Sequence, residues 1–183
     1  AHLLAAMVYA ESDWKKQWET TADKAKKEGE VIIYGPHNPA YQQVWSIFQK
    51  TYPEVKFNFV PGKGSDHAQR IVAERRAGKY LADLIMGGGS CCLAVVNKAP
   101  HPNATKLFVN WVLSREGQIA WQKFTAVNSL RVDIPKSDLP PDDVPQKGVN
   151  YFMLNSAKYN GQEGRRALHQ IVEDALKKAG KGK

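Results

Sequence analysis

The sequence predicts an α/β fold: a single lobe in which a mainly parallel sheet lies between two layers of helices. Three short apolar or alternating segments, each closed by glycine or proline, predict strands at residues 31–33, 55–60 and 82–86. The stretches between them, 39–50 and 69–77, have the composition of helices. Strands and helices that alternate in this way are typical of a right-handed βαβαβ unit with parallel strands.

The first strand runs into a turn that suits the start of a helix. Gly35 and Pro36 interrupt the apolar run, Asn38 is a favourable N-cap, and Pro39 is tolerated in a first helical turn. A helix that begins beyond the carboxyl end of a parallel strand presents free backbone N–H groups to a polar or anionic ligand. The turn is therefore a candidate binding site, although most single turns of this kind are ordinary connections.

The second and third strands end in similar polar, glycine-rich turns. Pro61 follows the second strand, and Ser65 or Asp66 is expected to cap the next helix, which Gly78 ends. The sequence Gly-Gly-Gly-Ser at residues 87–90 closes the third strand. In a parallel sheet all three turns lie at the same edge, so together they favour a binding site there.

The rest of the chain is mostly helical by pattern. Ser12 is expected to cap a helix that reaches Lys27, with Trp14 and Trp18 on its packing face. The other predicted segments are a strand at 93–96, helices at 104–113 and 115–124 with Ser114 as the cap between them, a return segment at 126–133, a proline-rich loop at 134–145 and a closing helix at 164–178.

Composition narrows the class of partner. The 183 residues carry a formal net charge of +8, but the lysines lie on predicted helix faces and at the tail rather than in an aromatic-interleaved stripe. We therefore expect no nucleic-acid partner.

The two cysteines, Cys91 and Cys92, are adjacent in the sequence. A disulfide between neighbouring residues is strained, so we do not expect one here. We expect instead buried strand residues or a junction between segments, with an interchain disulfide as a further alternative. No ligand spacing predicts a metal or cofactor.

Residues 1–10 are apolar and uncharged. They have the character of the hydrophobic region and cleavage site of a secretory signal peptide whose basic start is missing. A short hydrophobic helix that packs on the body is an equally favoured alternative. No other segment approaches the roughly 20 apolar residues needed to cross a bilayer, so we expect no membrane span.

Catalytic motifs are missing from the sequence. The histidines are widely separated, and no Gly-x-Ser-x-Gly turn presents a nucleophile. The run at residues 62–66 superficially suggests a phosphate loop but lacks its spacing. We therefore expect that this chain is not an enzyme.

Several blocks of sequence resemble the extracellular solute-binding proteins of bacterial ABC importers, in the branch that includes ferric-iron, thiamine and aminophosphonate binders. The blocks are "AKKEGEVIIYGP", "FQKTYPEVKFNFVPGKGSD", "RIVAERRAGKYLADLIMGG", "NKAPHPNATKLFVNWVLSREGQIAWQK" and "NSLRVDIP". The similarity spans roughly residues 14 to 175. Members of this family are two-lobed α/β proteins that trap a ligand between the lobes by hinge closure.

The resemblance implies a lobe like that of type II periplasmic binding proteins. The strand-end turns would form the first lobe's side of the cleft, and Gly88 and Gly89 would lie at the exit toward the second lobe. Arg131 would meet an anionic ligand or, as an alternative, form a surface salt bridge. The implied ligand-binding residues are Tyr34, Gly35, His37, Asn38, Gly64, Ser65, Asp66, Gly88, Asn128, Ser129 and Arg131.

The sequence departs from the family at a junction near residues 87–93. In the family a whole second lobe is built between the third strand and the "APHPNA" helix, whereas here a few residues join these points. The tyrosines that clamp ferric iron in the iron-binding members come from the missing part, so no metal site is carried over. The chain is then a truncated or rearranged gene product, an engineered single lobe or a natural remnant.

The expected function is that of a solute-binding component of an ABC-type importer, or a one-lobe derivative of it spanning residues 11–183. It would bind a small polar or anionic solute or metal complex without catalysis. The expected partners are importer permease subunits and, through the surface that met the second lobe, a second copy. The expected location is the periplasm or the extracellular space. The alternative is a scaffold or interaction domain that has lost ligand binding.

Overall fold

The computed structural model describes residues 2–87, 92–149 and 161–178, and for 2–12, 168 and 175–178 it describes the backbone alone. The chain divides into two compact units, residues 1–141 and 142–183, which are described separately. Among the described residues, no helix combines the length and the apolar character that a membrane crossing requires.

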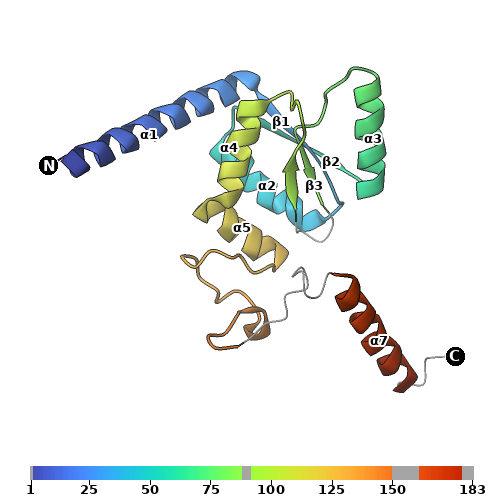
Figure 1. Cartoon of the computed structure of the whole chain (residues 1–183). Helices are drawn as coiled ribbons and strands as arrows, with labels where there is room; N and C mark the ends of the chain where they lie inside the picture. The colour runs from blue at the N-terminus through green and yellow to red at the C-terminus, as the bar shows by residue number, and fades with distance from the viewer. Residues whose placement is uncertain (1, 88–91, 150–160, 179–183) are drawn as a thin grey trace. The chain divides into compact units, whose positions relative to one another are not determined.

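A four-stranded sheet forms the centre of the first unit (Figure 1). Its strands are β1 (Glu30–Gly35), β2 (Lys56–Pro61), β3 (Leu84–Met86) and β4 (Leu93–Val95), in the order β2-β1-β3-β4. β1 is parallel to both β2 and β3, whereas β4 is antiparallel to β3. The predicted α/β lobe with a mainly parallel sheet is confirmed.

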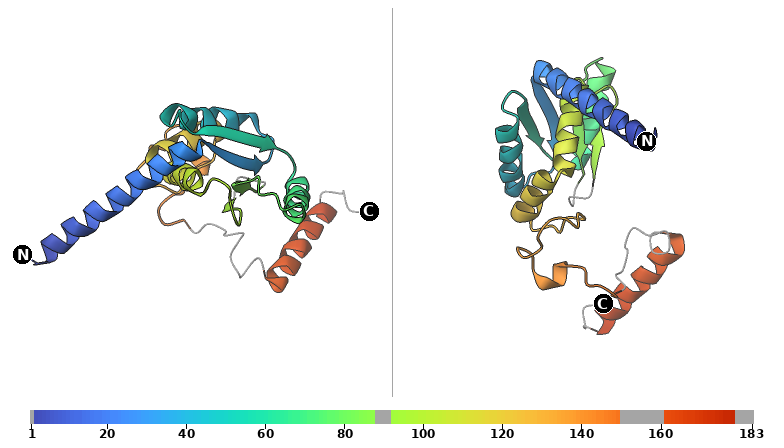
Figure 2. Two further views of the ribbon diagram at one scale, coloured as in Figure 1. Left: turned by 90° about the horizontal axis from the view of Figure 1, so that it is seen from above. Right: turned by 90° about the vertical axis from the view of Figure 1, so that its left-hand side faces the viewer.

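Helices cover both faces of this sheet (Figures 1 and 2). The helices of this unit are α1 (His2–Glu28), α2 (Pro39–Thr51), α3 (Gly64–Arg76), α4 (Pro102–Leu113) and α5 (Arg115–Thr125). Successive side chains of β1 point to opposite faces of the sheet. Val31 and Ile33 belong to the core on the side of α2 and α4, whereas Tyr34 contacts α3 on the other face. α1 packs on α4, and α5 packs on α2 and α4.

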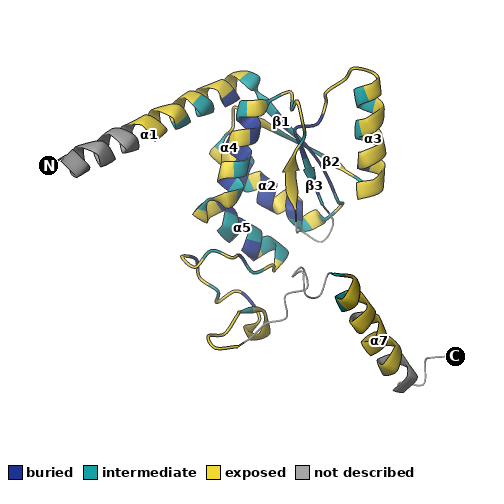
Figure 3. Cartoon of the chain, viewed as in Figure 1, coloured by how far each residue is buried: buried dark blue, intermediate teal, exposed yellow. Residues whose placement is uncertain are grey.

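Aromatic side chains dominate the core on the α2 and α4 side. Phe48 of α2 and Phe108 of α4 are both fully buried, and their ring centroids lie 5.1 Å apart in an edge-to-face arrangement. Trp111 continues this cluster from α4. Figure 3 shows the buried residues on the inner sides of α2, α4 and the sheet.

Two of the predicted helix caps are confirmed. The Asn38 side chain accepts a hydrogen bond from the backbone N–H of Ala40 at 3.0 Å, so α2 begins as expected. The Ser114 side chain accepts one from the N–H of Gly117 at 3.1 Å and begins α5.

Two other predicted caps are wrong. Ser12 lies inside α1, which runs unbroken from His2, because the residues before it include no helix breaker. α3 begins at Gly64 with Lys63 as a cap that makes no side-chain hydrogen bond, so Ser65 and Asp66 lie in its first turn. An acidic side chain in a first turn is favourable without capping, because it complements the positive end of the helix dipole.

The junction joins β3 and β4 as neighbouring antiparallel strands. Gly87 donates its N–H to the carbonyl oxygen of Cys92 at 2.8 Å. Cys92 is exposed, which contradicts the alternative of a buried strand residue for this cysteine. The predicted site residue Gly88, with Gly89 and Cys91, lies outside the described residues.

The second unit contains the helix α7 (Gln162–Lys178), close to the predicted closing helix. Ile171 and Val172 of this helix are 64% and 48% exposed. A short 3-10 helix, Pro141–Asp143, lies at the boundary between the units.

Candidate functional site

The carboxyl ends of β1 and β2 are closed rather than open. The ring of His67, which is only 4% exposed, lies 5.2 Å from the Tyr34 ring, and its Nε2 lies 3.2 Å from the carbonyl oxygen of Gly35. A Cβ on Gly62 would lie 2.8 Å from this imidazole, so only glycine fits there without a shift. His67 therefore fills the place where the sequence predicts an open binding turn.

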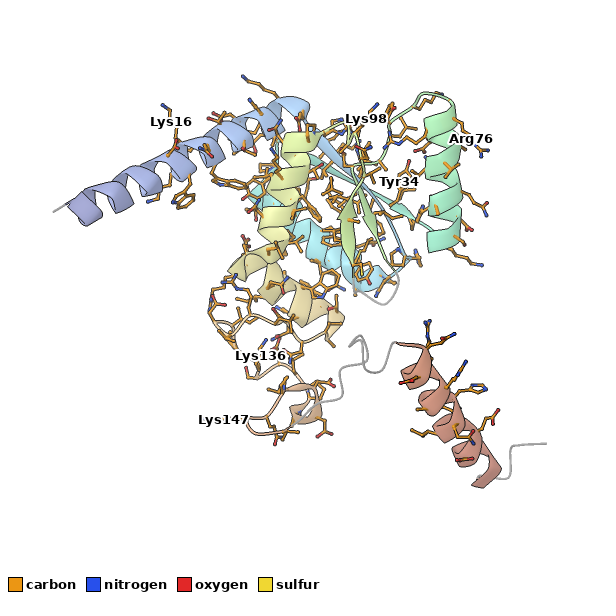
Figure 4. The ribbon with its side chains drawn as sticks, viewed as in Figure 1. Lys16, Tyr34, Arg76, Lys98, Lys136 and Lys147 are labelled. Atoms are coloured by element: carbon orange, nitrogen blue, oxygen red, sulfur yellow. The ribbon has the colours of Figure 1, made fainter. Side chains whose placement is uncertain are left out.

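Tyr34 points toward α3 (Figure 4). Its hydroxyl donates to Oε1 of Glu74 at 2.7 Å, and the guanidinium of Arg70 lies 4.7 Å from the ring centroid. Burial of the phenol, followed by the hydrogen bond to the Glu74 carboxylate, raises the pKa of Tyr34 to about 12. The predicted ligand residue thus holds α3 on the sheet.

The other predicted residues near these two strand ends are mostly exposed. His37, Gly64, Ser65 and Asp66 face solvent, while Gly35 is buried. The Ser65 hydroxyl donates to Oδ1 of Asp66 at 3.1 Å, so a carboxylate already lies at the N-terminus of α3. This negative charge disfavours an anion there.

A groove of about 500 Å³ lies beside the end of β3, and it brings three predicted residues together. Asn128, Ser129 and Arg131 contribute one side of it. Apolar side chains form much of the remaining wall, and the full lining is Trp45, Met86, Cys92, Leu93, Val112, Leu113, Gln118, Trp121, Val127, Asn128, Ser129, Leu130 and Arg131. We call this the strand-end groove.

Ser129 anchors one wall of the strand-end groove. Its hydroxyl donates to Oε1 of Gln118 at 2.6 Å and accepts from the N–H of Arg131 at 3.2 Å, and the side chain is 6% exposed. Nζ of Lys136 donates to the Ser129 carbonyl oxygen at 2.5 Å. These hydrogen bonds hold the segment after α5 in place. Ser129 therefore contributes to the shape of the groove, and its hydroxyl proton is already donated to Gln118.

Arg131 is already paired. Its Nε and Nη2 donate to the two carboxylate oxygens of Asp133 at 2.8 and 2.7 Å, and Nη1 donates to the Leu113 carbonyl oxygen at 3.0 Å. The hydrogen bond from Arg131 lowers the pKa of the Asp133 carboxyl. Of the two roles proposed from sequence, the structure shows the surface salt bridge.

The groove also depends on residues that the sequence did not single out. Trp45 of α2, Met86 of β3 and Trp121 of α5 supply its apolar wall. In the sequence these residues occupy the apolar positions of a strand and two helices, a pattern that equally predicts buried core. Their location at the carboxyl end of β3 follows only from the fold.

A separate polar cluster connects α4 to the sheet at the amino ends of the strands, opposite the end that carries the strand-end groove. The fully buried Asp83 accepts from the N–H of Ile32 at 2.8 Å and from both the N–H and Nδ1 of His101, at 2.8 and 2.9 Å. Nε2 of His101 lies 3.5 Å from Oε1 of Glu30. This cluster lies at the amino ends of β1 and β3 and fixes the start of α4.

The described parts of the chain contain no group of three or more His, Cys, Asp or Glu side chains that could hold a metal ion. No known protein-family model matches this sequence, and no curated protein matches it significantly.

Proposed function

We propose that this chain is a non-catalytic binding module, a one-lobe derivative of the solute-binding component of an ABC-type importer. The observation that carries the proposal is the strand-end groove. It lies at the carboxyl end of a parallel strand, where α/β sheets commonly bind ligands, and it includes the return segment that the resemblance assigns to the cleft edge.

The chemistry of the groove narrows the solute class. Asn128 contributes a polar side chain to the lining, whereas Trp45 and Trp121 contribute flat apolar surface. Because Arg131 is occupied by Asp133, an anionic solute has to compete with that carboxylate. Within the expected class of small polar solutes, a molecule with one polar end and an apolar body fits best.

The remaining features of the proposed role come from the family resemblance. They are importer permease subunits as partners, a periplasmic or extracellular location, and a homodimer in which a second copy replaces the missing lobe. A single lobe leaves a bound solute partly in solvent, so weak binding is expected from one copy.

A thermal-unfolding screen tests this proposal. The panel contains phosphate, a phosphonate, short carboxylates, amino acids, thiamine and ferric citrate. A solute that binds only the folded chain stabilises it, by about 2.7 kcal/mol at a hundredfold excess over its Kd. We expect at least one member to raise the Tm.

Two variants and a control locate the effect. Asn128→Ala and Trp121→Ala remove groove contacts and should reduce the Tm increase, whereas Arg76→Ala removes an exposed arginine on α3 and should preserve it. The proposal fails if no solute raises the Tm, or if the increase survives both groove variants.

A second candidate function is an interaction domain without a solute. Leu130 and Val132 are 98% and 99% exposed next to the groove, and Leu113 is 62% exposed. Apolar side chains gathered in this way mark a surface that another protein covers. The solute screen distinguishes the two, because no solute should raise the Tm of an interaction domain that has lost its ligand. Light scattering behind a sizing column then tests self-association: a dimer formed through this surface should become a monomer in the Leu130→Ser/Val132→Ser variant.

A further inference from the structure

The outer edge of β4 presents backbone groups that no described strand pairs with. Val96 donates its N–H to the Asp83 carbonyl oxygen at 2.9 Å, and Gly87 donates to that of Cys92 at 2.8 Å. Hydrogen-bonding residues alternate along an antiparallel strand, so residues 92, 94 and 96 face β3. The N–H and carbonyl groups of Leu93 and Val95 therefore point to the free edge.

An apolar groove accompanies this edge. It has a volume of about 500 Å³ and lies between the end of β4 and α4, where Val95, Val96 and Val109 contribute apolar surface. Val95 is 59% exposed and Leu93 is 36% exposed. A strand added beside β4 would place every second side chain toward α4.

Two lysines give the groove its charge. Lys98 and Lys106 both line it, and no carboxylate among the described residues forms a salt bridge with either. Lys98, which is labelled in Figure 4, lies over the Tyr80 ring with its Nζ 5.3 Å from the ring centroid, and this contact holds the cation at this edge. The pair is complementary to acidic side chains and repels a second copy of the same edge.

We propose that β4 binds an extended acidic peptide as a fifth strand. The peptide backbone pairs with Leu93 and Val95, its apolar side chains enter the groove against Val109, and its carboxylates meet Lys98 and Lys106. This site shares only Leu93 with the strand-end groove and does not depend on the proposed solute-binding function.

Fluorescence anisotropy with two labelled peptides tests the charge preference. One peptide alternates valine and glutamate, and the other alternates valine and lysine. We expect the glutamate peptide to bind the full chain at least about tenfold more tightly. Equal affinities, or no binding of the glutamate peptide up to its solubility limit, overturn the proposal.

Substitutions at Val95 test the backbone pairing. Val95→Pro removes an N–H that points away from β3, so the sheet should remain folded while peptide binding is lost. Val95→Ala also shortens the side chain but keeps the N–H, and should retain most of the binding. Circular dichroism and the Tm verify that both variants fold. Binding by a folded Val95→Pro variant equal to that of Val95→Ala overturns the proposed pairing.

A charge reversal keeps the test decisive if Val95→Pro fails to fold. Lys98→Glu/Lys106→Glu changes surface residues alone and should reverse the preference toward the lysine peptide. An unchanged preference contradicts the proposal.

Hydrogen exchange of the Leu93 and Val95 amides in the free chain tests whether the edge is open. Slow exchange of these amides contradicts the proposal, because the edge would then already be paired with a second copy or with another segment.

Discussion

Buried polar side chains of this lobe hold its elements together, and Tyr34 shows this most directly. Its phenol is 1% exposed and donates to the Glu74 carboxylate, with Arg70 over the ring. Both burial and the neighbouring negative charge favour the protonated phenol, which is why the pKa of Tyr34 rises to about 12.

This raised pKa makes stability depend on alkaline pH. The folded value of about 12 lies above the ordinary tyrosine value of 10.0. The stabilisation is therefore fully present below about pH 10 and is lost as the pH rises through about 12. Comparing the free energies of unfolding of wild type and Tyr34→Phe across this range should reveal a difference that shrinks as the pH rises.

Ultraviolet titration of the phenolate measures the same group. Tyr34→Phe should remove an ionisation step near pH 12, and Glu74→Gln should move that step to lower pH because it removes the carboxylate charge. If the titration curves of wild type and Tyr34→Phe keep the same high-pH step, Tyr34 is not the group described here.

At the residue scale, the sequence predicted local capping better than the interaction partners of the candidate ligand-binding side chains. Asn38 caps α2 as expected, because capping depends on residues two positions apart. Tyr34 and Ser129 were expected to meet a ligand, but Glu74 and Gln118 occupy their hydroxyls. These partners come from other elements, and no local pattern indicates them.

At the element scale, the crossing of α4 and α5 depends on one glycine. A Cβ at Gly117 would lie 2.1 Å from the Trp111 carbonyl oxygen, in the turn where α4 ends and α5 begins. Only the missing side chain lets the two backbones approach this closely.

Gly117→Ala should therefore destabilise the lobe although alanine favours helix. We expect the free energy of unfolding to fall by about 1 to 3 kcal/mol through overpacking. Gly64→Ala is the matched control in the first turn of α3, where a Cβ meets nothing within 4 Å. It should be neutral or stabilise by up to about 1 kcal/mol. Urea denaturation of the three proteins checks this, and equal effects of both substitutions would contradict the close-packed crossing.

Element predictions succeeded where local signals suffice. The βαβαβ order, α2 and α5 follow from apolar runs, caps and breakers close in sequence. The antiparallel direction of β4 could not be predicted, because it depends on its pairing with β3 across the junction. The start of α1 was placed too late, because Ser12 is as compatible with a helix interior as with a cap.

At the scale of the whole molecule, we propose that the lobe of residues 1–141 corresponds to one wall of a two-lobed cleft. Three features of this lobe are relevant: the strand-end groove, the exposed Leu130 and Val132 beside it, and the short junction after β3. Each follows if a second lobe once covered this face. We propose that the strand-end groove still binds a solute.

The tryptophan indole N–H signals in two-dimensional nuclear magnetic resonance test this claim most directly. The chain has five tryptophans, of which Trp45 and Trp121 line the strand-end groove, whereas Trp14 and Trp18 lie on α1. Titration with a solute that raises the Tm should shift the signals of Trp45 and Trp121 and leave those of Trp14 and Trp18 unchanged. Shifts confined to Trp14 and Trp18, or no shift at any solute concentration, would contradict it.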